Sequence, residues 1–240
     1  MEEKLTKKEN EQEFFFDQKA GKDKLYMVGG RDNRNHAIKL RAIIETLNLK
    51  KDDSILEVGI GEGEHAYHFL KCSNVHYTGI DISQKSLDVA RKRITSFEGR
   101  FILKKDNANK LSFEDNSFDA VFCAATLHHM EDPAIMISQM ARVLKPGGRI
   151  AIMEPNWIYP SNIGFMIFLK EDRNMWLMRR KNFRKWMSEA GLRDIAVENI
   201  IYTPPVPKFM IPLYDIIDSV CGRIPIIKRC SLMLFGNAGK

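Results

Sequence analysis

Apolar and polar positions along the chain follow two different spacings. Short runs rich in β-branched residues recur from Ser54 onward, separated by longer segments in which apolar residues return every three or four positions. This rhythm is typical of a parallel sheet with helices on both faces. The expected strands are Ser54–Val58, Val75–Ile80, Phe101–Lys104, Phe118–Cys123 and Arg149–Glu154. The expected helices are Asn35–Leu47, Gly63–Lys71, Gln84–Phe97, Pro133–Leu144 and Asn182–Ala190.

The rhythm changes after Glu154. The segment from Pro155 to Met178 carries prolines and aromatic residues but no strand pattern, so we interpret it as an inserted cap. Two more strands are expected at Asp194–Tyr202 and Ser231–Phe235, with an apolar segment between them. The pattern therefore predicts an α/β fold: a Rossmann-like, doubly wound, mostly parallel seven-stranded sheet with a cap inserted after the fifth strand.

Composition narrows the setting without deciding it. The longest aliphatic stretch, Ile163 to Leu169, is too short to cross a bilayer, and the start of the chain lacks a signal peptide, so we expect a cytoplasmic location. The four cysteines show no spacing typical of a disulfide framework or a metal site, so we expect reduced thiols and no metal. The net charge of +6 is most simply explained by charged residues on a solvated surface.

Part of the positive charge is clustered in the cap and just after it. Interleaved with methionines and Trp176, this mixture suits an anionic or membrane-associated ligand. The basic residues of this stretch are Lys170, Arg173, Arg179, Arg180, Lys181, Arg184 and Lys185.

A glycine loop directly follows the first expected strand. Glycines in Gly59-Ile60-Gly61-Glu62-Gly63 allow a sharp turn at positive φ and let a ligand approach bare backbone, although a purely structural turn has the same pattern. The second strand ends in Asp81, about twenty residues later, where a carboxylate accepts hydrogen bonds from a ribose diol. The third strand ends at Asp106 and Asn107, which are placed either to bind an adenine edge or to form a turn.

The charges of this loop separate two cofactor classes. The dinucleotide fingerprint GxGxxG requires a small residue where this chain has Glu64, and the Walker motif GxxxxGK[ST] is absent. Glu57 and Glu62 add two more negative charges near a helix N-terminus that would otherwise attract phosphate. The loop therefore favours a cofactor with an ammonium, a sulfonium and a ribose but no phosphate.

A series of motifs in order and at regular spacing carries a family resemblance. From about Leu49 to Glu154 the chain resembles the class I S-adenosylmethionine-dependent methyltransferases, in particular the ubiquinone/menaquinone-biosynthesis (type 11) group. The middle residue of Leu111-Ser112-Phe113 departs from the proline that is common in the family, which affects local loop shape. The motifs are Glu57–Gly63, Gly79–Ser83, Asp106, Asp115–Asp119, Leu127–Pro133 and Arg142–Gly148.

The resemblance implies a binding role for each matching position. Glu57 would lie near the cofactor's ammonium, and Asp81 would accept the ribose hydroxyls. The three loop glycines would lie beside the methionyl part and the ribose, Ile82 would pack on adenine, Asp106 with Asn107 would face the adenine edge, and Ala124 or Ala125 would offer backbone to the amino-acid end. The family also has an antiparallel last strand.

The length of 240 residues suits a single class I methyltransferase domain. We divide it into an N-terminal tail with lid helices (1–48), a cofactor-binding core (49–154), the cap insertion (155–180) and the C-terminal part of the sheet (181–240), which contains an apolar insertion (204–230).

Two adjacent histidines follow the fourth strand, at the edge where open α/β sheets bind ligands. An imidazole titrates near neutral pH, so His128 and His129 are the candidate catalytic residues, acting as a base if the methyl acceptor carries a proton. Because neighbouring residues point in different directions, we expect at most one to face the acceptor, and we favour His128. In the alternative interpretation both only hold the following loop together.

Acceptor contacts are expected from the cap side. Glu154, Asn156 and Trp157 close the fifth strand, and Tyr26 lies in the N-terminal lid. The apolar segment Phe209–Ile227 is flanked by basic residues, so it either lies on a membrane surface and admits a lipid-like acceptor or packs against the sheet.

The sequence therefore predicts a methyltransferase that transfers a methyl group from S-adenosylmethionine to a small metabolite, either lipid-like or isoprenoid. RNA or protein methylation is the first alternative, but the Asn-Pro-Pro-Tyr-like motif of base-flipping enzymes is missing after Cys123, so no nucleic-acid partner is favoured. A non-catalytic cofactor-binding subunit is the second. The sequence makes no prediction of the oligomeric state.

Overall fold

The computed structural model describes residues 5–21, 34–202, 211–224 and 227–240. The predicted lid contact Tyr26 lies outside these residues.

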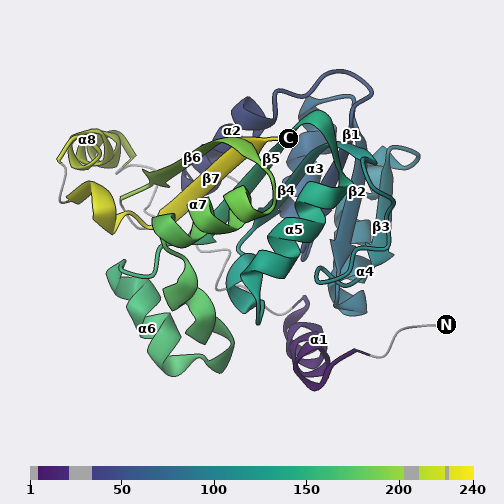
Figure 1. The fold of residues 1–240 in the computed structure, drawn as a ribbon, viewed down its shortest axis with the longest axis horizontal. Coiled ribbons are helices and arrows are strands. Elements are labelled where there is room, and N and C mark those ends of the chain that lie inside the picture. Colours follow the sequence, from purple (N-terminus) through teal and green to yellow (C-terminus); the bar gives the residue numbers. More distant parts are fainter. Residues whose placement is uncertain (1–4, 22–33, 203–210, 225–226) are drawn as a thin grey trace.

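The core is a seven-stranded sheet with the order β3-β2-β1-β4-β5-β7-β6, drawn in Figure 1. β7 pairs antiparallel with both β5 and β6, and the other pairs are parallel. This arrangement confirms the predicted doubly wound, mostly parallel sheet and its antiparallel last strand. The strands are β1 Ser54–Val58, β2 His76–Asp81, β3 Phe101–Lys105, β4 Phe118–Ala124, β5 Leu144–Pro155, β6 Arg193–Ile200 and β7 Met233–Gly239.

Helices cover both faces of the sheet (Figure 1). α5 and α7 lie over one face, where a core cluster includes Met136 and Phe183, and α2, α3 and α4 lie over the other, where a second cluster includes Ile43 and Phe69. The helices are α1 Lys7–Lys19, α2 Arg34–Leu47, α3 Glu64–Cys72, α4 Gln84–Ile94, α5 Pro133–Val143, α6 Pro160–Phe168, α7 Arg180–Glu189 and α8 Ile211–Cys221. Short 3-10 turns are η2 Thr95–Phe97, η3 Leu127–His129, η4 Lys170–Leu177 and η6 Ile227–Cys230.

Local chemistry explains where the helices over the site begin. Ser83 caps α4 by accepting a hydrogen bond from the Ser86 amide at 3.1 Å, and Asp132 caps α5 by accepting one from Ala134 at 3.0 Å. Proline at the first position of α5 needs no hydrogen-bond partner for its nitrogen. With these N-terminal hydrogen bonds, α4 begins directly after β2, and α5 begins after the loop that follows β4. The loops before both helices therefore lie at the carboxyl edge of the sheet.

The last strand differs from its prediction. β7 begins at Met233 and continues to Gly239, beyond the expected end at Phe235, because its backbone pairs with β5 and β6 along its whole length. A β carbon on Gly236 would lie 2.8 Å from Cδ1 of Phe183, so a residue that looks like a strand breaker is required for α7 to pack closely.

The cap consists of α6 and η4, with Met175 and Met178 buried beneath it. The cap and α1 lie at the same edge of the sheet (Figure 1). None of the helices in the described part of the chain has both the length and the apolar character needed to cross a membrane.

Candidate active site

The glycine loop after β1 adopts the backbone conformation that its glycines allow. Gly59, Gly61 and Gly63 have φ values of 78°, 53° and 75°. A β carbon on Gly59 would lie 2.3 Å from Oγ1 of Thr126, whereas the space around Gly61 is open. Amides of Gly59 and Ile60 both donate to the carbonyl oxygen of Ile80 at 2.9 Å, which fixes the loop to the end of β2. Exposed backbone is thus held beside the next strand.

Asp81 lies directly against this loop. Its two carboxylate oxygens accept hydrogen bonds from the amides of Gly61 and Ser83, at 2.8 and 2.9 Å. Burial outweighs these bonds and raises the pKa of Asp81 to about 6. A half-buried carboxylate with a raised pKa beside open backbone fits a ligand that brings hydroxyl groups, such as a ribose diol.

Glu57 makes its contacts within the core of the protein. Its side chain is buried, accepts a hydrogen bond from the Tyr77 hydroxyl, and lies 3.1 Å from Nδ1 of His65. The carboxylate of Glu62, on the loop itself, accepts the Gly21 amide at 2.8 Å and lies 3.7 Å from Arg93. A contact between Glu57 and the cofactor's ammonium therefore stays a prediction, and His65, given no role from sequence, is its direct neighbour.

The residues after β3 are held by their own loop and by α1. Asp106 accepts hydrogen bonds from the amide and hydroxyl of Ser112, at 3.1 and 2.6 Å. Asn107 donates from Nδ2 to Oε1 of Glu9 at 2.7 Å, and Asn109 donates to the same oxygen at 2.9 Å. The side chains expected at the adenine edge are thus engaged in hydrogen bonds within the protein, and their contact with adenine stays a prediction.

Helix α1 crosses the edge where the strands end. Asp17 accepts the Ser83 hydroxyl at 2.6 Å, Glu13 pairs with Lys105, and the Phe16 ring lies 5.1 Å from that of His129. Together with Glu9, these contacts reach the loops after β2, β3 and β4. Sequence reasoning expected a lid in this region but did not identify these residues, because a charged helix alone carries no signal for its partner.

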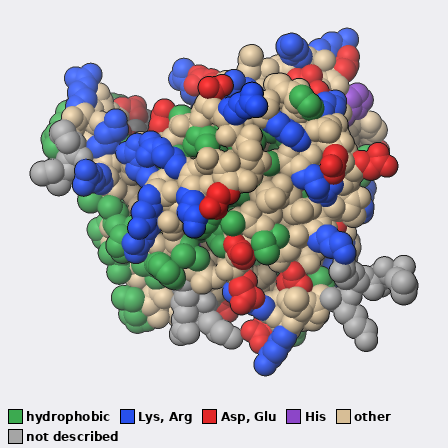
Figure 2. Space-filling view, viewed as in Figure 1, with side chains coloured by type: hydrophobic (Ala, Val, Ile, Leu, Met, Phe, Trp, Pro, Cys, Tyr) green, Lys and Arg blue, Asp and Glu red, His purple; other side chains and the backbone are tan. Residues whose placement is uncertain are grey.

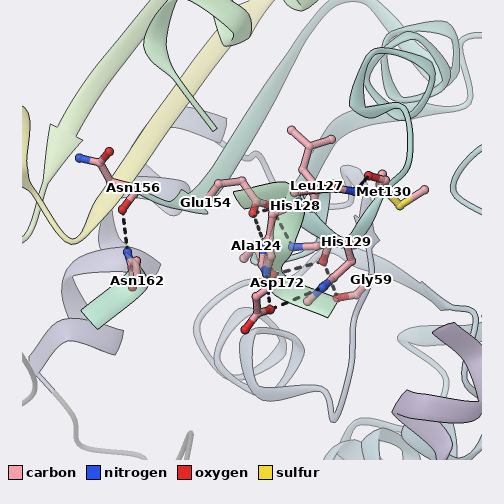
Figure 3. A network of polar contacts seen from close by, with 12 residues as sticks. Gly59, Ala124, Leu127, His128, His129, Met130, Glu154, Asn156, Asn162 and Asp172 are labelled. Carbon is pink, nitrogen blue, oxygen red and sulfur yellow. Dashed lines mark hydrogen bonds and ion pairs between the residues drawn. The ribbon is translucent and has the colours of Figure 1, made fainter. Parts of the chain in front are cut away.

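His128 is anchored by Glu154, as Figure 3 shows. Nδ1 of His128 lies 2.6 Å from Oε2 of Glu154, whose carboxylate also accepts the amides of Thr126 and Leu127 at 2.9 and 2.7 Å. Glu154 is fully buried. Its carboxylate, expected to bind the acceptor, is engaged in organising the turn after β4.

The other side of the histidine pair faces Asp172, which the cap contributes (Figure 3). Oδ1 of Asp172 lies 3.5 Å from Nε2 of His128 and 3.8 Å from Nδ1 of His129, and the two rings are 3.9 Å apart. Both rings face Asp172 instead of diverging because these residues form the turn η3, in which the alternation of a strand does not apply. Asp172 was not identified from the sequence, since the basic residues around it dominate the pattern.

The two imidazoles differ in charge. Burial disfavours a charged His128, but Glu154 and Asp172 outweigh it and raise the pKa of His128 to about 9. Burial and the neighbouring charge of His128 lower the pKa of His129 to about 3. At neutral pH His128 is therefore a cation between two carboxylates, and His129 is neutral.

The same cluster has the geometry of metal ligands. Within the described residues, His128, His129 and Asp172 each offer one ligand atom, all within 4.8 Å of one another. The absence of a metal stays a prediction from cysteine and histidine spacing.

The remaining predicted residues make contacts of other kinds. Asn156 donates a hydrogen bond from Nδ2 to the Arg229 carbonyl oxygen at 2.8 Å. Its backbone carbonyl oxygen accepts a hydrogen bond from Nδ2 of Asn162 at 2.8 Å, and this second bond ties β5 to the cap. Trp157 is half-buried with the Arg179 guanidinium 4.4 Å from its ring. Ile82 and Ala124 are half-buried, and Ala125 is exposed with a φ of 55°.

A sheet of order β3-β2-β1-β4-β5-β7-β6 with a glycine loop after β1 and an acidic residue ending β2 is the architecture of class I methyltransferases. Residues 56–152 match the family described as methyltransferase domain, and this part of the chain has the fold and motifs of the class I methyltransferases that depend on S-adenosylmethionine.

Comparisons with individual proteins agree with this family. The chain is 32% identical to 27-O-demethylrifamycin SV methyltransferase from Amycolatopsis mediterranei over 66% of its own length and 61% of the relative's. It is 32% identical to a demethylmenaquinone methyltransferase from Staphylococcus aureus over 50% of each chain. The fold also matches geranyl diphosphate C-methyltransferase from Streptomyces coelicolor, with a TM-score of 0.69, 12% identity and coverage of 98% and 99%. The matched regions thus span about half to three fifths of the two curated relatives' lengths.

Proposed function

We propose that this protein transfers a methyl group from S-adenosylmethionine to a small, lipid-like acceptor. One observation carries the proposal: two features lie at the same edge of the sheet. One is an acidic loop whose charges disfavour a cofactor with phosphate groups, and the other is a buried cluster of titratable side chains. The loop offers open backbone at Gly61 and the carboxylate of Asp81. The cluster combines His128, His129 and Asp172.

The residues of the loop fit the proposed cofactor. Asp81 would accept hydrogen bonds from the ribose hydroxyls. Burial destabilises the charged form of its carboxyl and raises its pKa, and hydrogen bonds from the ribose would offset that destabilisation. Gly61, around which the space is open, leaves room for the methionyl part, whereas Gly59 and Gly63 let Thr126 and Ala90 pack closely against the loop. When bound, S-adenosylmethionine supplies an electrophilic methyl group, so the protein's main task is to hold the acceptor in line and to exclude water. Positioning of this kind supplies up to about 7 to 11 kcal/mol.

His129 is the group we favour as the proton acceptor, in place of His128. His128 already carries its proton at neutral pH, whereas His129 is neutral. The pKa of about 3 makes His129 a weak base, which suffices because a hydroxyl becomes strongly acidic as its oxygen gains a methyl group. The Nδ1 atom of His129 lies 3.2 Å from the Glu171 carbonyl oxygen, so Nδ1 donates and Nε2 keeps its lone pair. As a hydroxyl acceptor gains the methyl group, its proton moves to Nε2. The proton gained at Nε2 would replace the positive charge that leaves with the transferred methyl group, so the site's total charge would be unchanged.

His128 and Asp172 then act as positioning residues. Glu154 fixes the ring of His128, and His128 together with His129 fixes Asp172 of the cap. Glu154 links both to the turn after β4. These contacts join the cap, which covers the acceptor, to the loop that holds the base.

The class of acceptor is inferred from the surroundings and from relatives. The curated relatives are named for a rifamycin and for demethylmenaquinone, and the fold neighbour for geranyl diphosphate. All three named compounds are small molecules with large apolar parts. The apolar cap of this chain, with Met175 and Met178 buried in it, is consistent with an acceptor of that kind.

Titration calorimetry and a labelling assay test the proposal. S-adenosylmethionine should bind and NADH should not, and labelled methyl groups should enter an extractable small product from a cell extract. His129→Gln should lower the rate about 100- to 10,000-fold while leaving cofactor affinity unchanged. Label in RNA or protein would contradict the proposed acceptor class, and absence of cofactor binding would contradict the activity itself. An equal rate for His129→Gln and wild type would reject the proposed base.

A further inference from the structure

Two parts of the surface, both on the side of the molecule that holds α6 and α8 in Figure 1, expose large apolar side chains. Most such side chains among the described residues lie in the cap, at Ile163, Ile167, Phe168 and Trp176, and in α8, at Leu213, Ile216 and Val220. Phe168 is 84% exposed and Ile216 63%. Apolar area gathered in this way marks an interaction site, because a solvated surface normally scatters it.

The exposed residues of α8 have the spacing of one helix face. Leu213, Ile216 and Val220 follow at intervals of three and four positions, the pattern of a face that packs on something apolar. Of the two alternatives drawn from sequence, packing of this face against the sheet is wrong for these three side chains, since each is at least half exposed.

Positive charge borders this apolar area. Figure 2 shows Lys and Arg side chains beside the hydrophobic ones on the side of the molecule that holds α6 and α8. Arg223, Lys228 and Arg229 follow α8 and are exposed, and Lys181 and Lys185 are exposed on α7. An apolar helix face with a basic border is the arrangement by which peripheral proteins lie on anionic lipid.

A groove next to α8 gathers further cationic groups. It has a volume of about 810 Å³, runs along β6, and is lined by Arg180, Arg184 and Lys228 against Glu198 and Asp218. Nε of Arg180 is buried there and has no hydrogen-bond partner within the described residues. A buried guanidinium nitrogen without an acceptor suits an anionic oxygen, as a lipid phosphate provides.

We propose that the exposed faces of α6, η4 and α8, with their basic border, form a docking surface for an anionic lipid bilayer. The apolar side chains enter the headgroup boundary, and the arginines and lysines pair with lipid phosphates. The surface does not depend on the proposed activity, because docking needs neither cofactor nor acceptor. If the methyltransferase proposal also holds, the cap would meet a lipid-like acceptor where such molecules reside.

Sedimentation of the full chain with vesicles tests the docking surface. Vesicles of phosphatidylcholine mixed with phosphatidylglycerol should bind the protein, vesicles of phosphatidylcholine alone should bind it far less, and added salt should weaken the binding. The variant Ile216→Asp should reduce the partition coefficient at least fivefold. Arg223→Glu combined with Lys228→Glu should reduce it at least tenfold, because each basic residue near the membrane surface contributes about 1 kcal/mol.

Matched controls separate the surface from general effects. Ile135→Asp changes an exposed apolar residue of α5, and Lys51→Glu with Lys92→Glu reverses two exposed charges elsewhere. Both controls should bind vesicles like wild type. Equal binding to neutral and anionic vesicles, no binding to either, or an equal loss in the controls would overturn the proposal. A dimer in solution that Ile216→Asp dissociates would also overturn it, since a second copy would then occupy the surface.

Discussion

Nδ1 of His128 lies 2.6 Å from Oε2 of Glu154, a carboxylate that is fully buried and that also accepts two backbone amides. The pair links the end of β5 to the turn after β4. The free energy of unfolding therefore depends on whether the imidazole of His128 is protonated.

The first prediction follows from that linkage. The folded-state pKa of His128 is raised from 6.5 to about 9, so its stabilising contribution is fully present below pH 6.5 and is lost as the pH rises through 9. Urea unfolding should therefore show about 3 kcal/mol less stability from this group at pH 9.5 than at pH 6.5. His128→Gln should remove this part of the pH dependence. A wild-type slope that persists in the variant would assign the effect to other groups.

Cofactor affinity should depend on pH through Asp81. The folded-state pKa of this carboxyl is raised to about 6, so it loses its charge as the pH falls through 6 and accepts ribose hydroxyls less well. Calorimetric titration with S-adenosylmethionine should show a dissociation constant that rises by up to about tenfold per pH unit below 6.

The control is Asp81→Asn, which should bind about 1.5 to 3 kcal/mol more weakly at neutral pH and show a flat profile. Affinity in the variant equal to that of wild type would remove Asp81 from the cofactor site.

Gly236 should tolerate no side chain. Alanine there places a β carbon 2.8 Å from the Phe183 ring, so Gly236→Ala should cost about 1 to 3 kcal/mol in the free energy of unfolding. Gly164 in α6 provides a matched control, because nothing lies within 4 Å of the position that an alanine methyl group would take, and the same change should stabilise the helix by about 0.5 to 1 kcal/mol. Denaturant unfolding of both variants measures the contrast. Equal effects would contradict the packing argument.

The lid helix should slow exchange of the cofactor. Glu9→Gln keeps the capping box with Thr6 but replaces the charge that binds Asn107 and Asn109. Stopped-flow measurement of S-adenosylhomocysteine release should show a rate several-fold faster than wild type. Lys7→Gln, an exposed change on the same helix, should leave the rate unchanged, and identical rates for all three proteins would separate α1 from the site.

The sequence predicted the parts of the fold that rest on local pattern. The strand before Gly59 and the glycine turn that follows it have local signals, since residue type and backbone conformation within a few positions decide them. The far end of β7 was not predictable, because Gly236 lowers strand propensity and only pairing with β5 and β6, together with Phe183, explains it.

The candidate site was predictable in a similar way. The histidine pair and Asp81 stand at the ends of strands, where a pattern indicates their position. Asp172 comes from a cap about forty residues away in the sequence, and Glu57 points into the core toward Tyr77. Nothing in the sequence next to either residue indicates these contacts. Which histidine holds the proton depends on the buried carboxylates around it, so it could not be derived from adjacency in the chain.

Asp172 belongs to the cap, yet it completes the cluster with His128 and His129. Asn174 of the same segment η4 donates from Nδ2 to the Met130 carbonyl oxygen at 2.9 Å, which holds the cap against the turn that carries the two histidines. A cap lifted from this position takes the carboxylate with it and leaves the two imidazoles without their shared partner. If the proposed function holds, enclosing the acceptor and positioning the two imidazoles would therefore occur together, and a change of cap that suits a new acceptor would have to keep an acid at this place.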